Sequence, residues 1–251
     1  MPDRPSPRPR SRRTPLLVLL AAGCVLVSGC GAAGPSAAPE AASSSASSAE
    51  PSTSSAGPST APTTAPSASP SAAPTLQVSD GKPRKATLSI AKIDLEDLEV
   101  EPYKGSPDDA PGTKIQDGGI AASPFGPKGG VGPGGVGNYI VTGHRSSSTK
   151  PFQDLPDLKV GEKVQVVADG QRYTYRIVAT RITSFRSKKS LAAQRAEVPG
   201  RPGVKATKAM ITVSTCRTPE DRAEGNFWSD KFHNPENRID KIGELVATRP
   251  V

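Results

Sequence analysis

The sequence contains few aromatic residues, few cysteines and no long hydrophobic run. Aromatic residues make up only 4% of the 251 residues, and basic stretches are not interleaved with them, so a base-stacking surface for nucleic acid is missing. The longest apolar run, Leu16–Val27, is shorter than the roughly 20 residues that span a bilayer as a helix. These absences argue against nucleic acid as a partner and against a membrane span of ordinary length.

The apolar run follows a cationic start that contains five arginines: Arg4, Arg8, Arg10, Arg12 and Arg13. A cationic segment before a short hydrophobic stretch is typical of an export signal. The run closes on Val27-Ser28-Gly29-Cys30, which resembles the lipobox of bacterial lipoproteins, where the cysteine is lipidated. An uncleaved anchor and a simple cleaved signal are the alternatives. We therefore expect residues 1–30 to be an export signal, with Cys30 as the lipidation site and an N-terminal membrane tether.

Half of the net positive charge of the chain lies in this signal. The whole chain carries 32 basic and 24 acidic residues, a net charge of +8. Without the five arginines and Asp3 of the signal, 27 basic and 23 acidic residues remain, a net charge of +4. The high isoelectric point is therefore weak evidence for a nucleic-acid partner.

Between the signal and the first strand-like segment the composition is biased. Residues 31–75 are almost entirely Ala, Ser, Pro, Thr and Gly, with no aromatic residue. Such a segment cannot bury enough apolar surface to offset the entropy lost on ordering. We expect residues 31–85 to form a disordered linker that holds the remaining domain away from the membrane.

Residues 86–251 are enough for one domain, and their pattern is β-rich. An Asp169-Gly170 turn between two strand-forming runs predicts a hairpin. Helical pattern is scarce, with short turns possible at Asp108–Ile115 and Ser190–Arg195, and two stretches, Asp117–Gly137 and Arg217–Asn237, look irregular. Short strands separated by turns favour a closed β-barrel or a sandwich. The expected strands are Ala86–Ile90, Tyr139–Thr142, Lys163–Val167, Arg172–Val178, Met210–Ser214 and Ile242–Ala247.

Only one cysteine remains once the export signal is set aside. Cys24 and Cys30 lie in the signal, so Cys216 has no partner for a disulfide within its domain and is either inert or present for its chemistry. It ends one expected strand, and His144 follows another. An imidazole can take the thiol proton, and an arginine can stabilise the oxyanion that an attacked carbonyl develops. His233 has no strand context and reads as a surface residue.

Four segments together resemble the sortases, and among them the class E sortases of actinobacteria. They are Leu88-Ser-Ile-Ala-Lys-Ile93, Gly137-Asn-Tyr-Ile-Val-Thr-Gly-His-Arg145, Pro151-Phe-Gln-Asp-Leu-Pro-Asp-Leu-Lys-Val-Gly161 and Ile211-Thr-Val-Ser-Thr-Cys216. The resemblance covers most of the domain and implies an eight-stranded sortase-type β-barrel. It also implies a cysteine transpeptidase without cofactor or metal, expected to be a monomer.

By this resemblance, Cys216 cleaves a C-terminal sorting signal, Leu-Ala-x-Thr-Gly or Leu-Pro-x-Thr-Gly, between Thr and Gly. A cell-wall precursor amine then receives the surface protein from a thioacyl intermediate. The resemblance makes His144 the base, Thr215 a substrate-binding residue and Arg238 the guanidinium, with Arg222 as the next candidate. The basic stretch 181–208 would recognise substrate. The expected location is the outer face of the cytoplasmic membrane of a Gram-positive, actinobacterial cell.

Two other functions compete with this interpretation. A peptidoglycan L,D-transpeptidase is also β-rich with one Cys and one His, but its motif normally has a glycine before the cysteine, where this chain has Thr215. A wall-binding lipoprotein with an inactive sortase-like domain is the second alternative. In that case Cys216 would be inert toward thiol reagents.

Overall fold

The computed structural model describes residues 76–251. The expected export signal, Cys30 and residues 31–75 of the expected linker lie outside this part. Within it, eight strands close into a barrel in the order β1-β2-β3-β4-β7-β8-β6-β5, and β5 pairs again with β1. The strands are β1 (Ala86–Ile90), β2 (Leu95–Lys104), β3 (Ala121–Phe125), β4 (Gly137–Thr142), β5 (Lys163–Ala168), β6 (Gln171–Ser184), β7 (Ala209–Cys216) and β8 (Asn237–Pro250). The prediction of an eight-stranded, mainly β barrel is confirmed.

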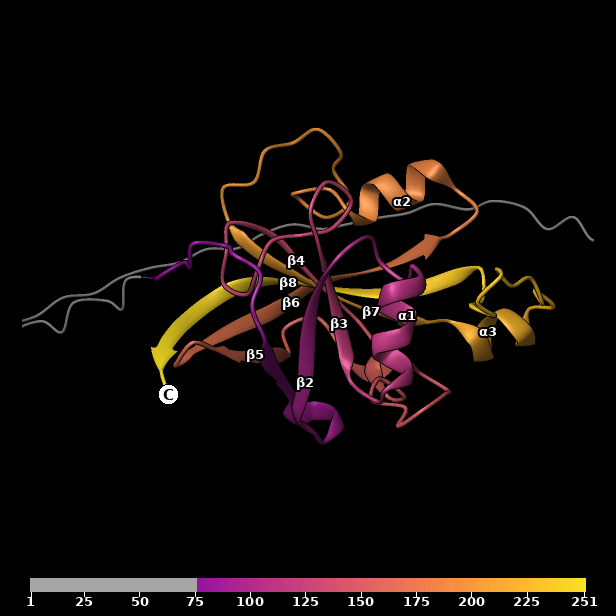
Figure 1. Cartoon of the computed structure of the whole chain (residues 1–251), viewed down its shortest axis with the longest axis horizontal. Helices are drawn as coiled ribbons and strands as arrows, with labels where there is room; N and C mark the ends of the chain where they lie inside the picture. The colour runs from indigo at the N-terminus through magenta and orange to yellow at the C-terminus, as the bar shows by residue number, and fades with distance from the viewer. Residues whose placement is uncertain (1–75) are drawn as a thin grey trace, which may run out of the picture. The chain divides into compact units, whose positions relative to one another are not determined.

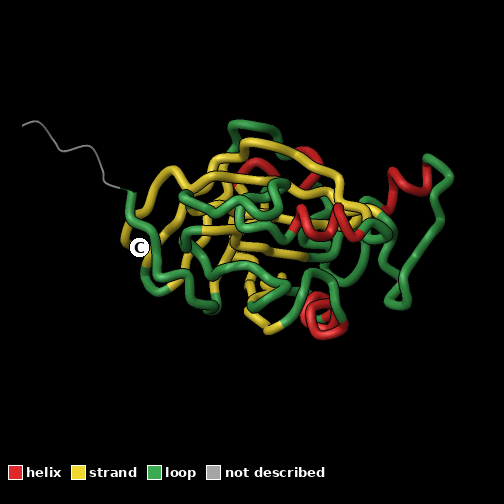
Figure 2. The backbone as a smooth tube through the Cα atoms, turned by 90° about the horizontal axis from the view of Figure 1, so that it is seen from above, coloured by secondary structure: helices red, strands yellow, loops and turns green. Residues whose placement is uncertain are grey.

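Helices are short and lie outside the strands (Figure 2). In Figure 1 the three α-helices gather on the side of the barrel away from the C-terminus. Asp109 caps the first of them by accepting a hydrogen bond from the Gly112 backbone N–H at 3.1 Å, as N-cap carboxylates commonly do. The helices are α1 (Ala110–Asp117), α2 (Lys188–Gln194) and α3 (Thr218–Ala223), with 3-10 turns η1 (Ala91–Ile93) and η2 (Leu155–Asp157).

Two of the strand pairs are parallel, and one of them sets up the functional end of the barrel. Strands β2 and β3 run parallel because α1 carries the chain back between them. Strands β4 and β7 also run parallel, with Thr142 opposite Ser214. His144 and Cys216 each come two residues after this pair. Parallel pairing therefore delivers both side chains to the same rim of the barrel.

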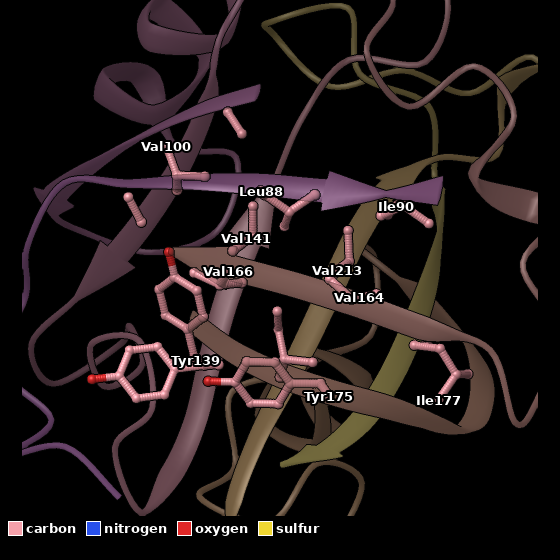
Figure 3. Packing of buried hydrophobic residues seen from close by; sticks show 14 of the residues in the cluster. Leu88, Ile90, Val100, Tyr139, Val141, Val164, Val166, Tyr175, Ile177 and Val213 are labelled. Atoms are coloured by element: carbon pink, nitrogen blue, oxygen red, sulfur yellow. The ribbon is translucent and has the colours of Figure 1, made fainter. Parts of the chain in front are cut away.

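The barrel interior is filled by apolar side chains from most of the strands. Strand β5 alternates exposed and buried positions, as a half-buried strand should. Figure 3 shows the labelled residues of β1, β4, β5, β6 and β7 pointing toward one another. Each of the following is at most 2% exposed: Leu88, Ile90, Val100, Tyr139, Val141, Val164, Val166, Tyr175, Ile177 and Val213. This packing fixes the strand ends that carry the site.

The Asp169-Gly170 hairpin matches its prediction. Strand β5 runs into β6 with Ala168 opposite Gln171, and both turn residues have positive φ angles, 48° and 69°. These are the conformations that a two-residue hairpin of the favoured twist requires, and Asp and Gly tolerate them best.

Several expectations about the elements were wrong or incomplete. Strand β2 was not expected, and β3 lies inside the stretch 117–137 that looked irregular. Helix α3 occupies the start of the second such stretch. The linker boundary also differs, because the Ser79 backbone N–H donates to Gly134 O at 2.9 Å and Gly132 N donates to Gly81 O at 2.7 Å. The domain therefore includes residues before Ala86. Within residues 76–251, no helix is both long enough and apolar enough to cross a membrane.

Candidate active site

A cavity of about 450 Å³ opens beside the ends of β4 and β7. Its lining includes Cys216 and His144, together with Asp117 at the end of α1 and Arg145 after the histidine. The opposite wall comes from α3 and the segment that leads into β8, including His233. The structure thus brings the two sequence-predicted groups, Cys216 and His144, into one cavity.

The Cys216 thiol is unpaired and partly buried. Its pKa is raised to about 11, chiefly because burial disfavours the thiolate. The positive charge of Arg238 opposes this rise, and the carboxylates of Asp108 and Asp230 add to it. At neutral pH the thiol is therefore protonated and needs a base to become a nucleophile.

His144 is 8% exposed and is held by a carboxylate. Its Nε2 lies 2.8 Å from Asp117 Oδ1. An ionised carboxylate only accepts hydrogen bonds, so Nε2 carries the proton and Nδ1 is the ring nitrogen that can accept one. The backbone also fixes the residue, since the Phe152 N–H donates to His144 O at 3.1 Å. This arrangement leaves one nitrogen of the imidazole available as a base.

Arg238 lies opposite Cys216 in the β7–β8 pair and is completely buried. Its Nε donates to Asp108 Oδ2 at 2.6 Å, and its Nη1 donates to Pro235 O at 2.6 Å. The guanidinium carbon stands 4.0 Å from the centre of the Phe185 ring, a cation–π distance. Its Nη2 has no hydrogen-bond partner within residues 76–251. The guanidinium is therefore held in place while one of its edges, at Nη2, keeps unused donors.

The carboxylate that binds this arginine belongs to a longer chain of contacts. Asp108 is 7% exposed and accepts a second hydrogen bond, from Gln116 Nε2, at 2.9 Å. The same Gln116 nitrogen lies 3.1 Å from Thr142 Oγ1, and that hydroxyl contacts Ala122 O at 3.3 Å. The connection links β8 through α1 to β4, the strand that leads to the histidine.

Thr215, predicted to bind substrate, has a buried side chain that does not line the cavity. Its hydroxyl donates to Gly143 O at 2.8 Å and so ties the cysteine strand to the residue before the histidine. Arg222, the alternative to Arg238, lines the cavity from α3 with an exposed side chain.

For two further parts of the chain, the structure differs from what the sequence indicated. His233, read as an ordinary surface residue, is exposed but forms part of the cavity wall. The stretch 181–208 contains the end of β6 and helix α2, and none of its residues lines the cavity. Within residues 76–251, no cluster of three His, Cys, Asp or Glu side chains is arranged to hold a metal ion.

Sequence reasoning missed Asp108 and Asp117. Both flank a segment that was expected to hold only a short turn, and nothing near them in the sequence is a functional signal. The N-cap pattern of Asp109 followed by Ala110 and Pro111 marked the helix, but not the partners of the carboxylates beside it. Their roles depend on contacts with residues up to 130 positions away.

A thiol that shares a rim cavity with an imidazole, opposite a buried guanidinium, is the arrangement of an enzyme that works through a cysteine nucleophile. Residues 121–228 match the family model of the sortase domain. Over these residues the chain is therefore similar to the sortase domain, a family of cysteine transpeptidases. The match includes His144 and Cys216 and ends before Arg238.

Solved structures agree on the fold. The SrtA sortase from Actinomyces oris is similar with a TM-score of 0.51 at 16% identity, over 71% of this chain and 89% of that one. Sortase E1 from Streptomyces coelicolor, solved with a tripeptide in its active site, is similar with a TM-score of 0.50 at 21% identity, over 69% of this chain and 94% of that one. No curated protein matches the chain in sequence. At these identities the structural likeness establishes the fold.

Proposed function

We propose that this protein is a sortase and cleaves a C-terminal sorting signal of the Leu-Ala-x-Thr-Gly or Leu-Pro-x-Thr-Gly type between Thr and Gly. The carboxyl group of the threonine then passes to an amine of a peptidoglycan precursor, which attaches a secreted protein to the wall. The observation that carries this proposal is the cavity that both Cys216 and His144 line, with Arg238 opposite Cys216 in the β7–β8 pair. The sortase family match favours this function over an L,D-transpeptidase.

In the first half of the reaction, His144 takes the thiol proton as the Cys216 sulfur attacks the threonine carbonyl carbon. In this proposal the tetrahedral oxyanion accepts a hydrogen bond from the Arg238 guanidinium, whose Nη2 has no partner within residues 76–251. The C–N bond to glycine breaks, and the imidazolium gives its proton to the leaving amine. A thioester remains, and the C-terminal peptide departs.

In the second half, the acceptor amine attacks the thioester carbonyl and loses a proton to His144. The C–S bond breaks as the new amide forms, and the proton returns to the Cys216 sulfur. Because the raised pKa keeps the free thiol protonated near neutral pH, both halves depend on the histidine as a proton carrier.

The test uses the purified full chain, a quenched Leu-Ala-x-Thr-Gly peptide and a Gly-rich acceptor amine. We expect cleavage and transfer that disappear in Cys216→Ala and fall by about 10²-fold or more in His144→Ala and Arg238→Ala. His233→Ala is the matched comparison, because it removes the other histidine of the cavity, and we expect a much smaller loss. Cleavage that persists in Cys216→Ala would refute the proposal, and a thiol inert to alkylation would favour the inactive alternative.

We also propose that the enzyme acts at the outer face of the cytoplasmic membrane of a Gram-positive, actinobacterial cell, tethered by residues 1–30. The support is the sequence of that segment, with its arginines, apolar run and Cys30. Mass spectrometry of the N-terminus from native membranes should find a diacylglyceryl group on Cys30. A chain that still begins at Met1 would refute lipidation and favour an uncleaved anchor.

A further inference from the structure

The guanidinium of Arg238 is held in place from three directions. Asp108 contacts its Nε, Pro235 O accepts from its Nη1, and the Phe185 ring covers its face. Each contact restricts the conformational freedom of the Arg238 side chain. What remains is Nη2, which is buried and has no partner within residues 76–251. A buried N–H without a partner is costly, and such groups in native proteins call for a functional explanation.

We propose that Asp108 is a positioning residue, which orients Arg238 so that Nη2 stays free to donate to the oxyanion of the reaction. The proposal rests on the proposed function, in which that oxyanion forms beside Cys216. Asp108 does not itself line the cavity. It acts through the arginine, and its own position is fixed by Gln116 of α1.

Several observations favour this role over a purely structural ion pair. The donors of the guanidinium on the Nε and Nη1 side are used and those on Nη2 are not, which leaves a donor free on a cation that lies opposite Cys216. Asp108 also has a φ of 55°, in the left-handed region that costs energy for a residue other than glycine. The backbone thus accepts strain at the position from which this carboxylate reaches the arginine.

The contacts beyond Asp108 reach the other half of the site. Gln116 Nε2 bridges Asp108 and Thr142, and Thr142 lies two residues before His144. One glutamine on α1 therefore connects the strand of the arginine with the strand of the histidine. Helix α1 sets the position of both groups relative to Cys216.

The charge of Asp108 gives the test a second readout besides activity, the reactivity of the Cys216 thiol. The charged groups that act on Cys216 are the cations Arg238 and Arg145 and the carboxylates Asp108 and Asp230, with the His144 imidazole in the same cavity. Removing the negative charge of Asp108 leaves Arg238 less neutralised. The pH profile of Cys216 alkylation should therefore move to lower pH, because a cation nearby favours the thiolate.

The experiment compares Asp108→Asn with the unaltered full chain. We expect kcat for peptide transfer to fall by roughly 10- to 100-fold with little change in KM, because the lost orientation matters in the transition state. The alkylation profile should shift to lower pH at the same time. Asp108→Glu, which keeps the charge, should restore part of kcat and the original profile. Asp109→Asn is the matched control, since asparagine also caps helices well and Asp109 does not contact the arginine.

Two results would overturn the proposal: an unchanged kcat, whatever the alkylation profile does, or a higher kcat, which would make Asp108 a blocking group. If Asp108→Asn does not fold, Gln116→Met decides, because it releases Asp108 without removing its charge. A lower kcat in that variant supports the proposal, and a normal kcat refutes it. If the unaltered chain does not process the peptide, the proposed function fails, but the alkylation profile still reports whether Asp108 controls Arg238.

Discussion

Two buried carboxylates near the start of β8, Asp108 and Asp240, differ in the partners that compensate for their burial. Asp108 binds a cation, Arg238, which keeps two donors on Nη2 unused. Asp240 lies two residues after Arg238 on β8, and within residues 76–251 it forms no salt bridge. It accepts from three neutral groups: Ser214 Oγ at 2.7 Å, Thr183 Oγ1 at 2.6 Å and Gln194 Nε2 at 3.0 Å. The Asp240 carboxylate therefore has hydrogen-bond donors around it, whereas the Arg238 guanidinium has a nitrogen, Nη2, without an acceptor within residues 76–251.

The difference separates polar burial that holds the fold from polar burial that serves chemistry. The Asp240 cluster joins β6, β7, β8 and α2, and it contacts no residue of the cavity lining. The Arg238 cluster stands directly opposite Cys216. We therefore expect changes at Asp240 to act on stability and changes at Arg238 to act on activity.

The largest effect should come from Arg238→Lys. A lysine keeps the positive charge for Asp108 but lacks the guanidinium fork and its spare donor. We expect kcat/KM for peptide transfer to fall by about 10²- to 10³-fold, the usual loss for an oxyanion donor, while the melting temperature changes little. Nearly normal activity in this variant would contradict the expectation that Arg238 serves the chemistry.

Asp240→Ala should produce the opposite pattern. It leaves the donors of Ser214, Thr183 and Gln194 without their acceptor in a buried place, and we expect a loss of about 3 kcal/mol in the free energy of unfolding. Denaturant unfolding measures this loss, and transfer assays scaled to the folded fraction should remain close to the unaltered protein. A stable but inactive variant would show that this cluster also serves the chemistry.

The pH dependence of stability tests the same cluster more finely. Burial raises the pKa of the Asp240 carboxyl above its ordinary value of 3.8, so the folded protein favours the protonated form. The stability that Asp240 contributes is then fully present below pH 3.8 and is lost as pH rises through the folded pKa. Denaturant unfolding at several pH values should show the unaltered protein losing stability relative to Asp240→Asn as pH rises. If the stability of the unaltered protein relative to Asp240→Asn stayed constant or increased as pH rises, the raised pKa would be contradicted.

The smallest effect should come from Asp117→Asn. Asp117 contacts His144, but its side chain is 64% exposed, so solvent screens its charge. We expect kcat/KM to fall only about threefold, within what one exposed charge usually contributes. Asp154→Asn, an exposed carboxylate outside the cavity lining, is the control and should have no effect. A loss as large as that of Arg238→Lys would mean that burial does not decide which carboxylates matter.

The strands with clear alternation or β-branched residues could be predicted from the sequence, including the hairpin of β5 and β6. Strand β2 was missed because Glu96, Asp97, Glu99 and Glu101 give it a charged outer face, and β3 because it contains Pro124 and follows a glycine pair. Their pairing is a property of the closed barrel, in which parallel neighbours stabilise segments of weak intrinsic preference.

The site was predictable where a residue type is rare and unpredictable where it is common. One cysteine and two histidines leave few choices, and the family resemblance pointed to Arg238. The domain has many aspartates, and only the fold brings Asp108 and Asp117 to their partners. Asp240 and Lys241 are charged residues in the last strand, before the segment Ile242–Ala247 that the sequence predicts as a strand. Both are buried with partners, and Lys241 Nζ donates to Leu158 O at 2.6 Å.

Strand β8 both completes the sheet and supplies the arginine. It pairs with β6 along most of its length and with β7 as far as Cys216. A chain that has been synthesised only as far as Cys216 has the thiol but not the cation that faces it. Under the proposed function, the site is therefore complete only when β8 has paired with β7, so that closure of the barrel and completion of the site are one step of folding.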